Sequence, residues 1–147
     1  MPERGPLRIE SCRKISSPLD TGRPGTWARA HPILARAMSD TAICLLLTTC
    51  PDAASAQSLA DSLVTARLAA CVSQLPGLVS TYRWQGQIQR ESEVQLIIKT
   101  STACRARAMA HIQTQHPYAV PEILAIAVSD GLPAYLAWVA QNTAEDD

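Results

Sequence analysis

From residue 41 onward, apolar residues fall into short blocks whose spacing alternates between the pattern of a strand and that of a helix. The continuous apolar run at 43–48 is typical of a central strand buried on both faces. The stretch 52–68 contains no glycine or proline, begins with Asp52 as a good N-cap, and repeats apolar residues every three or four positions. The pattern therefore predicts a strand followed by an amphipathic helix.

The remaining blocks continue this alternation. They predict a strand at 70–75 that resumes at 78–84, strands at 88–100 and 123–128, a helix from Ser101 or Thr102 to Pro117, and a last helix from Pro133 to about Gln141. The turn at 84–87 joins two of these strands as a hairpin. The order β-α-β-β-α-β plus a terminal helix predicts a ferredoxin-like α+β fold, with a four-stranded antiparallel sheet and two helices on one face.

One face of such a sheet is left without helices. The apolar strand residues exceed what two helices can cover, and they include Val72, Leu78, Leu96, Ile98 and Ile126. A large exposed apolar patch usually marks a site of association. We therefore expect an oligomer whose subunits cover one another's open sheets.

Residues 1–37 differ from the rest of the chain. They contain five prolines and three glycines, few apolar residues, and seven basic against three acidic residues, which leaves a charge of +4. Such a segment buries too little apolar surface to offset its ordering entropy, so we expect a disordered extension followed by one domain over 41–143. Met38 precedes the ordered pattern directly and is a candidate for the true start of translation.

Composition narrows the possible partners. After residue 37 the chain carries six basic and ten acidic residues, scattered rather than clustered, which argues against nucleic acid as a partner. No apolar run approaches the ~20 residues that span a bilayer, so no membrane partner is expected. The five cysteines are odd in number, lack Cys-x-x-Cys spacing and follow no signal-peptide pattern, which favours a cytoplasmic location.

The run His116-Pro117-Tyr118-Ala119-Val120-Pro121-Glu122 concentrates the candidate chemistry. Its prolines force the preceding helix to stop and the chain to leave extended, so an imidazole, a phenol and a carboxylate share one rigid corner. The corner serves either as a ligand site or only as a structural turn. The sequence shows no nucleophile–base spacing, glycine-rich phosphate loop or paired carboxylates, so we do not expect an enzyme.

Several motifs carry a family resemblance. They are Ala69-Ala70-Cys71-Val72, Leu75-Pro76-Gly77, Tyr82-Arg83-Trp84-Gln85-Gly86, Ile97-Ile98-Lys99-Thr100, the His116–Glu122 run and Pro133-Ala134-Tyr135-Leu136. In order and spacing the chain resembles the CutA divalent-cation tolerance family over about residues 41–143. The resemblance implies a cytoplasmic homotrimer that responds to copper and other divalent metal ions. An alternative implied by the architecture is a PII-like trimer that binds a small metabolite or a partner protein in clefts between subunits.

The metal ligands carry over only in part. In some members copper ligation is assigned to a cysteine three residues before the strand-ending proline and to two adjacent histidines, which here correspond to Thr48, Gln115 and His116. Only His116 retains a metal-ligating side chain, so the resemblance implies at most weak binding of copper or another divalent cation. Cys50 is expected to point away from His116 if its strand continues straight, although a turn could redirect it.

Four further residues are candidates for an intersubunit pocket: Lys99, Tyr118, Glu122 and Trp84. They would line a cleft for a metal ion or a small anion. Large aromatic residues such as Trp84 are also common anchors of cores and interfaces, so both interpretations stay open for this set.

Overall fold

The computed structural model describes residues 42–143. Its elements are β1 (Ile43–Cys50), α2 (Ala53–Thr65), β2 (Cys71–Trp84), β3 (Gln87–Ser101), α3 (Arg105–Gln115), β4 (Leu124–Ala127) and α4 (Pro133–Asn142). This order confirms the predicted sequence of strands and helices. The expected extension over 1–37 lies outside the described residues.

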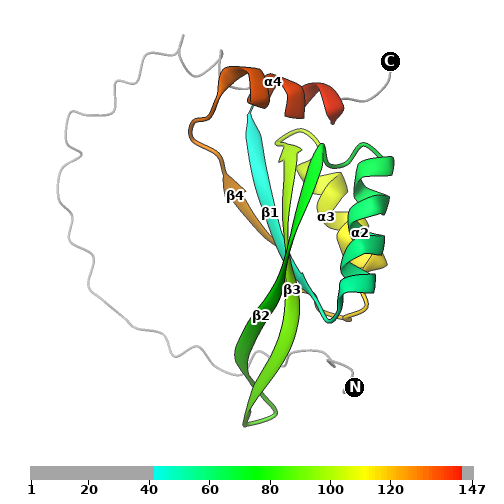
Figure 1. The fold of residues 1–147 in the computed structure, drawn as a ribbon, viewed down its shortest axis with the longest axis vertical. Coiled ribbons are helices and arrows are strands. Elements are labelled where there is room, and N and C mark those ends of the chain that lie inside the picture. The colour runs from blue at the N-terminus through cyan, green and yellow to red at the C-terminus, as the bar shows by residue number, and fades with distance from the viewer. Residues whose placement is uncertain (1–41, 144–147) are drawn as a thin grey trace, which may run out of the picture.

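The four strands form one antiparallel sheet in the order β2-β3-β1-β4. Helices α2 and α3 lie side by side on one face of this sheet, and α4 lies across one end of it (Figure 1). The α+β class and the four-stranded antiparallel sheet are thereby confirmed. Among the described residues, no helix is long and apolar enough to cross a membrane.

Strands β2 and β3 form a long hairpin that extends past the helices (Figure 1). Its two-residue turn has positive φ at both Gln85 (46°) and Gly86 (80°), which is the type I′ geometry that matches the twist of paired strands. The expected break at Pro76-Gly77 is instead a bulge within one strand, since the pairing shifts between Leu75 and Leu78. Gly77 supplies the left-handed backbone there, with φ of 81°.

The hydrophobic core lies between the sheet and the α2/α3 layer. Alternate residues of the central strands point into it, among them the fully buried Leu46, Leu96 and Ile98. Leu63 of α2 and Ile112 of α3 meet them from the helices. Of the apolar strand residues expected to exceed what two helices can cover, Leu96 and Ile98 therefore belong to the core, and Val72, which pairs with Ile98, also packs against it.

The open face is built from the other alternate residues. Leu45 pairs with Ile126, and Leu47 pairs with both Leu124 and Ile97, so these five side chains occupy neighbouring positions on the face away from α2 and α3. Leu124 and Ile126 are 52% and 47% exposed. The predicted uncovered apolar face thus exists, and Ile126 is the residue of the expected set that belongs to it. We call these five residues the open-face patch.

The contrast between the two faces of α2 gives a direct test of the core. Leu63→Ala should lower the free energy of unfolding by about 2–5 kcal/mol, because the side chain is fully buried and its removal leaves a cavity. Val64→Ala, at the next residue and 44% exposed, should cost less than about 1 kcal/mol. Urea denaturation of both variants measures the difference, and equal losses would contradict this assignment of the core.

Candidate functional site at the His116 corner

The corner forms where α3 meets proline. His116 is the C-cap of α3, and its extended backbone (φ −73°, ψ 138°) is the conformation that the following Pro117 favours. Its N–H still donates to the carbonyl of Ile112 at 2.9 Å, so the last helical turn remains closed. His116 as a whole residue is 8% exposed. The predicted end of the helix at this corner is confirmed.

Both ring nitrogens of His116 contact backbone groups. Nε2 lies 2.9 Å from the carbonyl oxygen of Thr49, and Nδ1 lies 3.1 Å from the backbone nitrogen of Tyr118. A carbonyl can only accept and a backbone N–H can only donate, so Nε2 carries the proton and Nδ1 carries the lone pair. The neutral Nε2–H tautomer therefore ties the end of β1 to the corner.

Cys50 lies beside this ring. Its Sγ is 3.8 Å from Nε2 of His116, and the residue has no exposed surface. Burial raises the pKa of the Cys50 thiol to about 11, and the nearby carboxylates of Asp52 and Glu93 act in the same direction. The expectation that Cys50 points away from His116 is wrong, because Cys50 is the last residue of β1 and faces the helix layer, where His116 ends α3.

A buried carboxylate completes the corner. The hydroxyl of Tyr118 donates to Oε1 of Glu93 at 2.9 Å, and the hydroxyl of Ser80 donates to Oε2 of the same side chain. The rings of Tyr118 and His116 also approach each other, with 5.1 Å between centroids. Sequence reasoning missed Glu93, and the available signal was a carboxylate at the start of the apolar run that forms the centre of β3.

The other candidate residues are Lys99 and Trp84, which lie on the sheet, and Glu122, which ends the corner run. Lys99 donates to the hydroxyl of Ser73 and to the carbonyl of Ile97. Trp84 pairs with Gln87 at the hairpin turn, twelve residues along β3 from Lys99, or roughly 40 Å for an extended strand. Glu122 is exposed. Within one chain Lys99 and Trp84 do not converge with Tyr118, and the intersubunit pocket stays a prediction.

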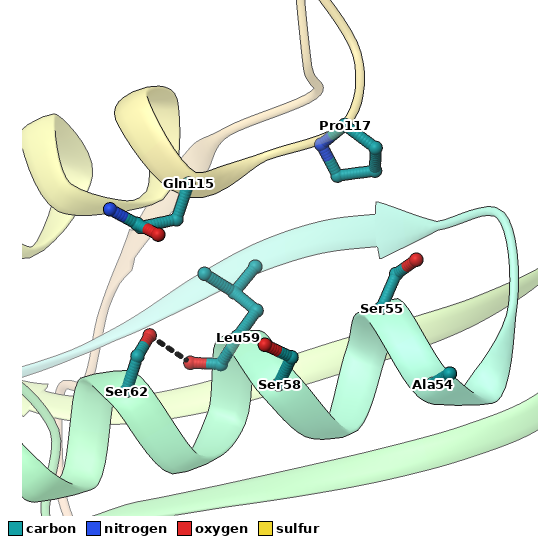
Figure 2. Close-up of a pocket in the computed structure, with 7 residues that line it drawn as sticks. All are labelled: Ala54, Ser55, Ser58, Leu59, Ser62, Gln115 and Pro117. Atoms are coloured by element: carbon teal, nitrogen blue, oxygen red, sulfur yellow. Dashed lines mark hydrogen bonds between the residues drawn. The ribbon is translucent and has the colours of Figure 1, made fainter.

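The two substituted ligand positions are also separated. Thr48 is buried in the core, where its hydroxyl has no hydrogen-bond partner among the described residues. Gln115 lines a groove of about 330 Å³ between α2 and α3, together with Ser58 and Ser62 (Figure 2). No group of three His, Cys, Asp or Glu side chains suited to a metal ion occurs within residues 42–143. A closed site of the usual three or four ligands is therefore not present in the described chain.

Comparison with known proteins identifies the family. Residues 44–142 match the family described as CutA1 divalent ion tolerance protein. The chain belongs to the CutA1 family. The divalent-cation tolerance protein CutA of Pectobacterium atrosepticum is 47% identical over 105 residues, which cover 69% of this chain and 96% of that protein. The CutA protein of Thermus thermophilus is 41% identical over 99 residues, covering 67% and 96% of the two chains.

Solved structures agree with this assignment. The crystal structure of CutA from Xylella fastidiosa superposes with a TM-score of 0.69 at 48% identity and covers 69% of this chain and 98% of that one. CutA1 from Oryza sativa gives a TM-score of 0.69 at 34% identity, with coverage of 71% and 96%. The predicted family and its role in divalent-cation tolerance are thereby confirmed.

The buried Cys50 thiol should make the stability of the protein fall at alkaline pH. Because the fold raises the pKa of Cys50 from 9.0 to about 11, the folded state keeps a proton that the unfolded state has lost. This contribution to stability is fully present below pH 9 and is lost as pH rises through about 11.

Cys50→Ser should therefore lose fewer degrees of melting temperature over that range than the parent protein. Cys71→Ser, at a more exposed strand position, is the control and should retain the parental slope. Identical slopes in all three proteins would contradict a buried, protonated Cys50.

Proposed function

We propose that the protein acts in divalent-cation tolerance as a non-enzymatic cytoplasmic homotrimer that binds copper or another divalent cation weakly. The observation that carries this proposal is the geometry of His116, the one family ligand position that keeps a metal-ligating side chain. Its ring is beside a thiol and almost buried, yet both nitrogens already have backbone partners. A divalent ion must compete with these partners.

That competition accounts for weak rather than tight binding. An ion on Nε2 replaces the proton donated to Thr49, and the proton shifted to Nδ1 then faces the N–H of Tyr118. Each lost hydrogen bond costs about 1 kcal/mol, and a buried group left without a partner costs more. With one imidazole and no closed set of ligands, the gain for divalent copper exceeds these losses only slightly.

The open-face patch supports the trimer. Leu124 and Ile126 lie on the edge strand β4, beside the half-buried Leu45, Leu47 and Ile97. Apolar side chains in this number on one continuous sheet face are better suited to an interface than to water. The polar neighbours Lys99 and Gln95 already hydrogen-bond within the chain, which lowers the cost of covering them.

Polar contacts in the helix layer support a non-enzymatic role. Ser62 Oγ lies 2.9 Å from Nε2 of His111, a distance that would suit a nucleophile and its base. However, the same hydroxyl donates to the carbonyl of Leu59 at 2.9 Å within α2 (Figure 2). The Ser62 proton thus points at the helix backbone, so the hydroxyl oxygen accepts from the His111 ring. His111 therefore does not act as a base toward Ser62 in this arrangement.

A second candidate function is a PII-like trimer that binds a small anionic metabolite or a partner protein. The observation that favours it is Lys99, a half-buried ammonium on the open face, where subunits would meet. Stabilisation by an anionic metabolite that Lys99→Met abolishes would favour this candidate over cation binding.

A charge within the open-face patch should dissociate the trimer. Ile126→Asp places a carboxylate within the proposed interface, beside Leu45, where it would be desolvated without a partner. Sedimentation at low micromolar concentration should give three times the subunit mass for the parent protein and a smaller species for the variant. Val64→Asp, on the outer surface of α2 and similarly exposed, is the matched control and should stay trimeric. A parent protein of one subunit mass would contradict the proposal.

Divalent copper should bind weakly and through His116. In isothermal titration, His116→Asn should lower the affinity at least tenfold, since its Oδ1 can still accept from Tyr118 while the Nε2 ligand is lost. His111→Asn, whose ring contacts Ser62 of α2 and not the corner, is the control and should leave affinity unchanged. Equal affinity in the His116 variant and the parent would remove His116 from the site and leave the corner with a structural role alone.

A further inference from the structure

The loop between β4 and α4 contains the dipeptide Asp130-Gly131 and lies at the periphery of the domain (Figure 1). Both residues are exposed. The backbone nitrogen of Gly131 lies 2.8 Å from Oδ1 of Asp130 and donates to it. A backbone nitrogen is thus held against the carboxyl group of the preceding side chain, and joining the two groups closes a five-membered ring.

The other aspartates of the described residues lack this arrangement. Asp52 is the N-cap of α2, and its Oδ1 accepts from the N–H of Ser55 rather than from the next residue. Asp61 lies inside α2, and its Oδ1 accepts from the side chain of Gln57. Within a helix the following backbone nitrogen is also held by the regular hydrogen-bond pattern and does not turn toward the side chain. Asp130 alone among these three contacts the nitrogen that it can react with.

The second residue of the pair also favours ring closure. A side chain on the attacking residue crowds its nitrogen and restricts the rotation of its backbone, whereas Gly131 has none. Residues 128–132 belong to neither a helix nor a strand. Loops of this kind sample more conformations than the elements that they join. Rotation within Asp130 can therefore bring the nitrogen onto Cγ without breaking a helix or a sheet.

We propose that Asp130 converts spontaneously to isoaspartate through a succinimide that it forms with Gly131. The Gly131 nitrogen attacks Cγ of the protonated carboxyl group, and the nitrogen proton leaves with the carboxyl hydroxyl as one water. A water then opens the ring at either carbonyl. Opening at Cγ restores aspartate, and opening at the backbone carbonyl of Asp130 leaves the main chain running through the former side chain. One water is lost and one is regained, so the step needs no oxidant or other reactant.

The modification changes the connection between β4 and α4, because isoaspartate adds one atom to the main chain. Both ends of the loop are fixed: the N–H of Val128 donates to the carbonyl of Ile43, and the carbonyl of Leu132 accepts the first N–H groups of α4. Gly131 packs so closely against Leu136 that a Cβ at this position would lie 3.0 Å from its Cδ2. A longer chain has little room here, so α4 must shift.

Ageing of the purified full-length protein at physiological temperature tests the site. Electron-transfer fragmentation of its peptides distinguishes a main chain that runs through a side chain from an ordinary one, and so measures the modified fraction at each position. The parent protein should accumulate isoaspartate at residue 130. Asp130→Glu should accumulate at least about tenfold less rearranged chain there, because the ring formed by glutamate has one more atom and closes less readily. Asp61→Glu is the matched control and should age at residue 130 as the parent does.

Circular dichroism and sedimentation before ageing establish that each variant is folded and assembled as the parent is. The aged parent should melt a few degrees below the fresh protein, and aged Asp130→Glu should keep its melting temperature. Absence of isoaspartate at residue 130 of the aged parent would overturn the proposal, as would equal modification at Asp52 and Asp61. Modification at residue 130 with no difference in melting between the aged parent and aged Asp130→Glu would overturn the shift of α4.

Discussion

The structure depends on the position of β1, which pairs with β3 on one side and with β4 on the other. Its alternate residues serve two environments: Leu46 and Cys50 complete the core beneath the helices, while Leu45 and Leu47 belong to the open face. A strand with apolar surroundings on both faces does not alternate between apolar and polar residues, and its sequence is therefore one apolar run. Both the stable core and the surface available for assembly are consequences of this single segment.

The His116 corner is attached to that strand through backbone groups rather than through side-chain charge. The carbonyl of Thr49 and the N–H of Tyr118 fix the tautomer of the ring, and the ring in turn holds the segment after α3 against the end of β1. Cys50 is brought to the imidazole by the same arrangement. Structural and ligating roles therefore compete for the same two nitrogen atoms, so metal affinity at this corner is limited by the stability of the fold.

Much of the fold could be predicted from the sequence, since blocks of strand and helix periodicity and two proline-marked corners define the order of elements. The two faces of β3 could not be assigned from the sequence, because Leu96, Ile97 and Ile98 are apolar at consecutive positions, and only the register with β1 assigns Leu96 to the core. At the candidate site, the prolines predicted the corner and His116, but not its hydrogen bonds. The Cys50–His116 contact and the buried Glu93 depend on packing between distant segments, which local patterns do not encode.

The long hairpin of β2 and β3 has a consequence for how the domain reaches its final state. Its outer half extends past the helix layer, and Val79 and Ile88 are more than half exposed there (Figure 1). A two-stranded ribbon without a packed face is only marginally ordered in water. Contacts from neighbouring subunits would order it, so folding of this arm and association would be one thermodynamic event. The melting temperature would then rise with protein concentration, and dilution alone would weaken the arm before the core.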